Sequence, residues 1–185
     1  MCQMGKLLYA AIASLDGYVA DRNGNFDDLA PDDEVHAFVN DLERPVGTYL
    51  LGRRMYEVLA VWETFETDNA VSKDYAELWR DRDKIVYSST LTDVTTARTR
   101  IERSFDPDAI RELKASTDRD LSIGGPDIAG QAFRAGLVDE ILLFTNPVVF
   151  GGGNAAFPDD VHIELELLDE RRFSSGVVYL RYGVG

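Results

Sequence analysis

Three short turns in this chain carry residue types that could bind phosphate groups. The first contains Gly124, Gly125 and Pro126, between the apolar run 121–123 and a segment with apolar residues at helical spacing. Residues without a Cβ let a ligand approach the backbone, and the free N–H groups of a helix N-terminus attract an anion. The helix predicted here would place a phosphate near Asp127 and Ile128. A glycine pair alone is more often an ordinary turn.

The other two turns follow apolar runs at 48–51 and 84–87, and they consist of Gly52, Arg53 and Arg54 and of Ser88, Ser89 and Thr90. Because ligands bind at the carboxyl edge of open parallel sheets, we expect all three turns to meet there. Fixed positive charge, hydroxyl groups and two helix starts suit a dinucleotide better than a single phosphate. The alternative for both arginines is a solvated helix turn paired with Glu57.

Composition narrows the class of protein. The 185 residues fit one domain, 1–185, and 45% of them are hydrophobic. A formal net charge of −14 argues against binding to nucleic acid or to an anionic membrane surface. No apolar run approaches a membrane span and no secretory signal is recognisable, so we expect a cytoplasmic protein. Cys2, His36 and His162 are too few for a disulfide or a zinc cage, and we expect no metal site.

The hydrophobic pattern predicts alternating strands and helices. Residues 6–14, 48–51, 84–87, 121–123 and 138–149 read as buried strands, and 164–173 with 177–183 as a C-terminal hairpin. Helices are predicted over 35–42, 53–62, 69–82 and 128–133. A further helix is predicted to begin at Pro107, with Asp106 as its N-cap. This order predicts an α/β fold with a mixed, mainly parallel central sheet, helices on both faces and a C-terminal β-hairpin.

Common nucleotide motifs are absent. No Lys and Ser/Thr pair follows Gly125 as in a P-loop, and the three spaced glycines of a Rossmann fingerprint are missing.

Five pieces in order nevertheless resemble the dihydrofolate-reductase-like superfamily, in the branch of the riboflavin-biosynthesis reductase C-terminal domain. The pieces are 13–20 (ASLDGYVA), 51–57 (LGRRMYE), 123–126 (IGGP), 136–140 (GLVDE) and 147–153 (PVVFGGG). The resemblance covers residues 6–182 and implies a three-layer dihydrofolate-reductase-like fold.

The resemblance also implies an NADPH-dependent reductase acting on a small, pyrimidine- or pterin-like substrate. Arg53 and Arg54 would meet the 2′-phosphate, the 88–90 turn the adenosine, and 124–128 the pyrophosphate. Backbone groups of Ile12 and Ala13 would meet the nicotinamide amide, and Asp16 is the candidate catalytic residue. The alternative for Asp16 is a plain Asp-Gly turn. A homodimer is implied, with strand 138–149 and its glycine loop as the contact.

The chain departs from the family at several positions. Ser89 stands where members often carry a basic residue, so a preference for NADPH over NADH would rest on Arg53 and Arg54. Glu34, His36 and Asp41 give no clear match to the pterin carboxylate, and zinc-deaminase motifs are absent. The rival hypothesis is a catalytically silent nucleotide-binding or oligomeric protein with the same fold; a mononucleotide-using transferase is a third.

Overall fold

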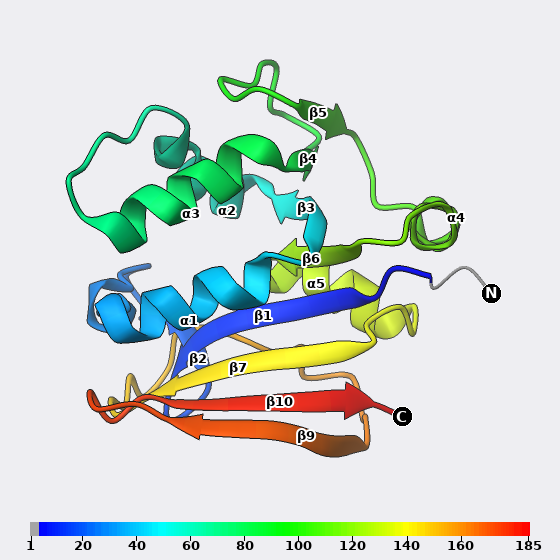
Figure 1. The fold of residues 1–185 in the computed structure, drawn as a ribbon. Helices are drawn as coiled ribbons and strands as arrows, with labels where there is room; N and C mark the ends of the chain where they lie inside the picture. The colour runs from blue at the N-terminus through cyan, green and yellow to red at the C-terminus, as the bar shows by residue number, and fades with distance from the viewer. Residues whose placement is uncertain (1–3) are drawn as a thin grey trace.

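The chain folds around a mixed eight-stranded sheet, as the sequence predicts (Figure 1). The computed structural model describes residues 4–185, so Cys2 lies outside the described residues. The strand order is β5-β4-β3-β6-β1-β7-β10-β9. Its strands are β1 (Leu7–Ser14), β3 (Val46–Gly52), β4 (Asp83–Tyr87), β5 (Thr99–Glu102), β6 (Asp120–Gly124), β7 (Glu140–Asn146), β9 (Leu165–Arg172) and β10 (Val178–Val184). A separate pair joins β2 (Tyr18–Ala20) to β8 (Asn154–Ala155).

Six strands from β5 to β7 run parallel, and only the C-terminal hairpin is antiparallel to its neighbours. Apart from the edge strand β5, the parallel strands are largely buried on both faces, which explains their continuous apolar runs. In β1, for example, Leu7 and Tyr9 face one core and Leu8 faces the other. The carboxyl ends of the parallel strands therefore share one edge of the sheet.

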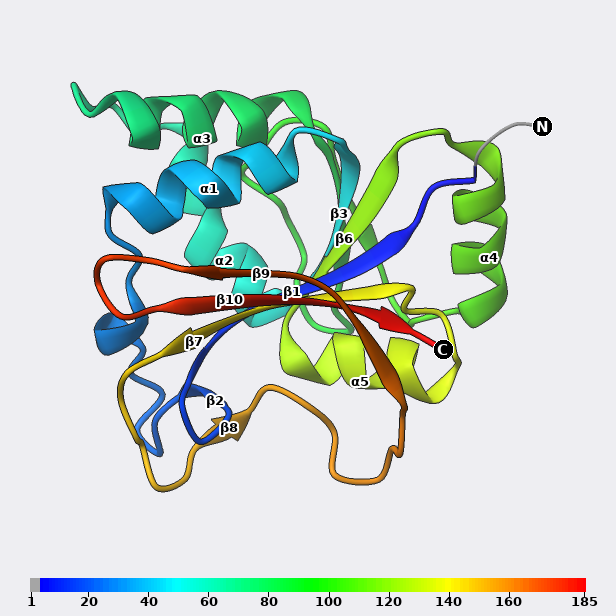
Figure 2. The same cartoon turned by 60° about the horizontal axis from the view of Figure 1, so that its bottom comes forward.

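Helices cover the sheet in two layers, seen from its hairpin side in Figure 2. One core lies beneath α4 (Pro107–Ser116) and α5 (Pro126–Arg134), where Ile110, Ile128 and Phe133 are buried. The opposite core lies beneath α1 (Asp33–Glu43), α2 (Arg53–Leu59) and α3 (Ala70–Asp81). Asp32 caps α1 through a bond from the Val35 amide, and Asn69 caps α3 in the same way from Ser72.

Two predicted elements are shorter than expected. The helix predicted over 53–62 ends at Leu59 and continues as the 3-10 turn η2 (Ala60–Glu63). Val58, which the helical spacing predicts on the inner face, is 44% exposed. The strand predicted over 138–149 is β7, which ends before Pro147 because proline has no N–H for the ladder. Both edges of β7 are paired, with β1 and β10, so an edge-to-edge dimer contact cannot form there.

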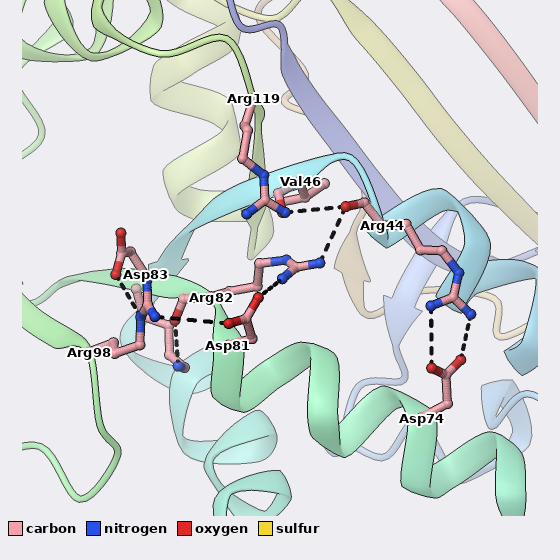
Figure 3. A network of polar contacts seen from close by, with 9 residues as sticks. Arg44, Val46, Asp74, Asp81, Arg82, Asp83, Arg98 and Arg119 are labelled. Carbon is pink, nitrogen blue, oxygen red and sulfur yellow. Dashed lines mark hydrogen bonds and ion pairs between the residues drawn. The ribbon is translucent and has the colours of Figure 1, made fainter.

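Arginine side chains form a network of hydrogen bonds and ion pairs at the amino edge of the sheet (Figure 3). Arg119 donates to the carbonyl of Val46 at 2.7 Å and to that of Arg44 at 3.2 Å, and Arg82 also donates to the Arg44 carbonyl. The Arg44 guanidinium binds both carboxylate oxygens of Asp74 on α3. The network thus joins the start of β3 to α1, α3 and the residue before β6, at the end of the sheet opposite the three turns.

Within residues 4–185, no helix is long and apolar enough to cross a membrane. The same part of the chain contains no group of three or more His, Cys, Asp or Glu residues placed to hold a metal ion.

Candidate cofactor and substrate site

The three turns singled out in the sequence lie side by side at the carboxyl edge of the sheet. Strand β3 lies between β4 and β6, with Gly52 paired with Tyr87 and Leu51 paired with Gly124. The residues that follow these strand ends therefore emerge next to one another. The sheet topology brings together all the residues predicted for the phosphate and adenosine parts of the site.

In the glycine turn after β6, Gly125 has a backbone conformation that favours glycine, and Gly124 is closely packed. Gly125 has a φ of +105°, a conformation that side chains rarely adopt, and a Cβ there would lie 3.7 Å from the Gly52 backbone nitrogen. A Cβ on Gly124 would lie 3.1 Å from Cγ of Met55 and 3.2 Å from Cδ2 of Leu51. The close packing explains how the turn after β6 contacts the turn after β3.

The N-terminus of α5 leaves backbone donors available at this edge. Gly125 provides no side-chain cap, and Pro126 has no N–H. Among residues 4–185, no group accepts a hydrogen bond from the backbone N–H of Asp127 or Ile128. Helix α2 has only seven residues, so positive charge at its start depends on the arginine side chains more than on the helix dipole.

Arg53 and Arg54 differ in their surroundings. Arg53 donates from Nε to Glu57 at 2.7 Å, which is the pairing weighed as the alternative, and from Nη1 to Thr90 Oγ1 at 2.8 Å. Its side chain therefore bridges the turn after β3 to the turn after β4. Arg54 is exposed and forms no ion pair or hydrogen bond within the described part of the chain. Of the two, Arg54 is the guanidinium open to an incoming anion.

The turn after β4 is built around Ser88. Its buried hydroxyl accepts hydrogen bonds from the amides of Thr90 (3.3 Å) and Leu91 (3.0 Å), whereas Ser89 and Thr90 are exposed. Arg103, which sequence reasoning missed, donates to the carbonyls of Ser88 and Leu91. It follows β5, a short strand half of whose residues are exposed, and no apolar pattern pointed to it.

Asp16 follows β1, the strand that pairs with β6, and it joins two loops. Its Oδ1 accepts hydrogen bonds from Ser14 Oγ (2.7 Å) and the Phe150 amide (3.0 Å), and its Oδ2 accepts one from the Gly151 amide (2.8 Å). The Ser14 hydroxyl, followed by the Phe150 amide, lowers the pKa of the Asp16 carboxyl. Asp16 is therefore an ionised carboxylate at neutral pH.

Ile12 and Ala13 lie in the last part of β1, where both are paired with β7. The Ala13 carbonyl already accepts a hydrogen bond from Asn146 Nδ2 at 3.3 Å, and Asn146 is buried. Asn146 is a second residue that the sequence did not single out. It fixes the carboxyl end of β7 to that of β1, beside the backbone expected to meet the nicotinamide.

We expect the substrate to be enclosed by the loops 16–28 and 151–154, the first helix around 35–38 and the segment 62–65, and specific contacts hold several of these. Gly151 to Gly153 all have positive φ, and Arg22 donates to the Gly151 carbonyl at 2.8 Å. The ring of Trp62 packs edge to face against Phe65 and Tyr75, with centroids 4.9 Å away in both cases. Two surface cavities, of about 400 and 450 Å³, include no residue of the three turns, and the second is lined in part by Glu63, Thr64 and Phe65.

Comparison with known proteins indicates the family of this chain. The family described as the RibD C-terminal domain matches residues 5–179. An uncharacterized Bacillus subtilis protein, YyaP, is 28% identical over 181 residues, covering 96% of this chain and 94% of that one.

Solved structures share the fold. A Shewanella sp. PV-4 protein assigned to riboflavin biosynthesis superposes with a TM-score of 0.74 at 21% identity, covering 98% of this chain and 99% of that one. A pyrimidine reductase-like protein from Corynebacterium diphtheriae gives 0.71 at 15% identity, covering 98% and 92%. A Thermotoga maritima deaminase and 5-amino-6-(5-phosphoribosylamino)uracil reductase gives 0.70 at 14%; this chain spans 57% of its length.

Proposed function

Because the chain belongs to the RibD C-terminal domain family, we propose that it is an NADPH-dependent reductase of a small pyrimidine- or pterin-like molecule. The observation that carries the proposal is the meeting of the three turns at the ends of β4, β3 and β6. They form a continuous edge with free helix donors, exposed hydroxyls and an open guanidinium. Fold alone would not suffice, since the same architecture can carry different activities.

The residues at this edge fit a dinucleotide phosphate. The free amides of Asp127 and Ile128 suit a pyrophosphate, and Gly125 leaves room for its approach to the backbone. Arg54 suits the 2′-phosphate, because a guanidinium binds phosphate with paired donors. Ser89 and Thr90 present hydroxyls for the adenosine ribose. These groups come from three separate segments, so the site exists only in the folded sheet.

In the proposed reaction, bound NADPH supplies a hydride to a carbonyl or imine carbon of the substrate. The end of β1, fixed to β7 by Asn146, positions the reacting groups and limits access of water. One proton must also reach the substrate oxygen or nitrogen. Asp16 itself holds no proton at neutral pH, so its ionised carboxylate would orient a water molecule through which a proton from bulk solvent is relayed to the substrate, and the water regains the proton that it gives up.

Titration with NADPH and NADH, followed by intrinsic fluorescence, tests the proposal. We expect NADPH to bind with a Kd below about 1 mM, within the usual range for enzyme ligands. Arg54→Ala should weaken NADPH binding by roughly tenfold or more and leave NADH nearly unchanged, because only NADPH carries the 2′-phosphate. Arg53→Ala should act in the same direction.

Arg111→Ala is the matched control, since Arg111 is an exposed arginine on α4 paired with Asp108. It removes the same charge away from the three turns. If neither dinucleotide binds, the chain is a silent member of its family. If Arg54→Ala weakens both dinucleotides equally, Arg54 does not contact the 2′-phosphate.

A further inference from the structure

The ion pair between Arg53 and Glu57 lies at the edge of the sheet where the three turns meet. Arg53 Nε donates to Glu57 Oε1 at 2.7 Å, and the two side chains are 48% and 46% exposed. The residues are four apart on α2, the spacing at which side chains on a helix meet. An exposed pair of this kind contributes little to the stability of a fold. The pair therefore matters chiefly for what its two groups can still bind.

The Glu57 carboxylate occupies a donor that a phosphate would use. A guanidinium binds phosphate best through two parallel N–H groups, and Nε together with Nη2 forms one such pair. Nε carries a single proton, and in Arg53 that proton is directed to Glu57. Nη1 donates to Thr90 Oγ1 at 2.8 Å, and Nη2 donates to no group of residues 4–185. A phosphate that takes both Nε and Nη2 of Arg53 must therefore displace the Glu57 carboxylate.

The same carboxylate suits a ribose that carries no phosphate. Glu57 Oε2 accepts no hydrogen bond within the described part of the chain, so it can accept one from a hydroxyl. In other dinucleotide sites an acidic side chain binds the ribose 2′-hydroxyl of NAD in this way. A carboxylate also repels a phosphate by its charge. Glu57 therefore opposes the 2′-phosphate, whereas the neighbouring Arg54, which has no ion pair, attracts it.

We propose that Glu57 competes with the 2′-phosphate of NADPH for the Arg53 guanidinium and thereby limits the preference of the protein for NADPH over NADH. This inference rests on the proposed function, because it requires a dinucleotide at the three turns. Glu57 is a specificity-determining residue, and it takes no part in hydride or proton transfer. With Glu57 ionised, Arg54 is the arginine of α2 that is open to the 2′-phosphate; without that charge, Arg53 is open as well.

Glu57→Gln tests the inference, because it removes the charge and keeps an oxygen that can accept a hydrogen bond from Arg53. Isothermal titration calorimetry of the whole protein measures the Kd of each dinucleotide. NADPH affinity should rise by roughly tenfold, and NADH affinity should stay within about twofold or fall. Asp41→Asn is the matched control, since Asp41 is an exposed carboxylate paired with an arginine three residues further along α1. It lies away from the three turns and should change neither Kd.

The same substitution in an Arg53→Ala background shows whether Glu57 acts through Arg53. Glu57→Gln should then increase NADPH affinity by less than it does in the wild type, because no guanidinium is released. Equal gains in both backgrounds would overturn the competition for Arg53. The melting temperature of each variant is measured to show that it is folded.

The titrations separate this inference from the proposed function. If both dinucleotides bind and Glu57→Gln leaves the ratio of their Kd values unchanged, or shifts it toward NADH, the inference is wrong and the proposed function stands. If neither dinucleotide binds to the wild type, the proposed function is wrong and the inference fails with it.

Discussion

Arg103 holds the turn that begins at Ser88. Its Nη1 donates to the Ser88 carbonyl at 3.1 Å and to the Leu91 carbonyl at 2.6 Å, across 15 and 12 residues of sequence. The side chain is exposed, although its charge lies against the loop that follows β4. It therefore supplies a basic group beside Ser89, where the sequence has no basic residue of its own.

Replacing Arg103 with Ala should weaken NADPH binding more than NADH binding, by roughly tenfold, because a charged donor near the 2′-phosphate is lost. Arg103→Lys keeps the charge but cannot donate to two carbonyls with the same planar group, so it should recover part of the NADPH affinity. Titrations of both dinucleotides measure this difference. Equal losses for the two cofactors would mean that Arg103 only shapes the turn.

Gly125→Ala should damage the pyrophosphate part of the site. At a φ of +105° the new methyl group costs about 1–3 kcal/mol of stability and obstructs the approach to the α5 amides. Gly136→Ala is the matched control, because Gly136 also has a positive φ (+63°) and nothing lies within 4 Å of a Cβ there. Both variants should melt earlier, and only Gly125→Ala should also lose dinucleotide affinity. Retained affinity would remove Gly125 from the proposed site.

Asp16→Asn should lower kcat by roughly 100-fold or more and leave the NADPH Kd unchanged, since general acid-base groups contribute on that scale. The lowered pKa of Asp16 keeps the carboxylate ionised, so wild-type activity should persist to pH values below the usual carboxyl range. Ser14→Ala removes the hydrogen bond that lowers this pKa most. Its activity should therefore fall at a higher pH than that of the wild type. A pH profile that is identical in both proteins would argue against an ionised Asp16 in the reaction.

Glu43 should make stability depend on pH. Burial raises the pKa of this carboxyl to about 7, despite the opposing effects of the Tyr49 hydroxyl and the Arg82 guanidinium. An unfolded Glu ionises near pH 4.3, so the stabilisation is fully present below that pH and is lost as the pH rises through about 7. The loss is on the order of 3 kcal/mol. Thermal melts at pH 5 and pH 8 should show a larger drop for the wild type than for Glu43→Gln. Equal drops would exclude Glu43 as the cause.

The elements that could be predicted from the sequence are those marked by local signals, such as a capping residue or apolar residues at helical spacing. Helix α3 begins and ends within one residue of the predicted 69–82 segment, because Asn69 caps it and its apolar residues recur at helical spacing. The three shortest strands, β2, β5 and β8, escaped prediction because they depend on a distant partner: Tyr18 pairs with Ala155, and Thr99 pairs with Lys84. The same holds for the place of β6 between β3 and β1, which no local pattern encodes.

The residues of the candidate site also fall into two groups: those that local signals indicate, and those whose relevance depends on contacts far along the chain. Glycines, arginines and hydroxyls after apolar runs indicated which turns could bind phosphate, and sheet topology then explains why they meet. Arg103 and Asn146 could not be found in this way, because their relevance comes from hydrogen bonds to carbonyls far along the chain. Nor does the sequence distinguish Arg53, which bridges to Thr90, from Arg54, which is open.

The arginine network at the amino edge allows thermal resistance and ligand affinity to be adjusted separately. Arg119, the residue before β6, donates to the carbonyls of Arg44 and of Val46, the first residue of β3, whereas the three turns follow the carboxyl ends of β3, β4 and β6. Substitutions there would alter the melting temperature with the turn geometry preserved. Variation between related chains could therefore accumulate at the amino edge without a change in the cofactor they use.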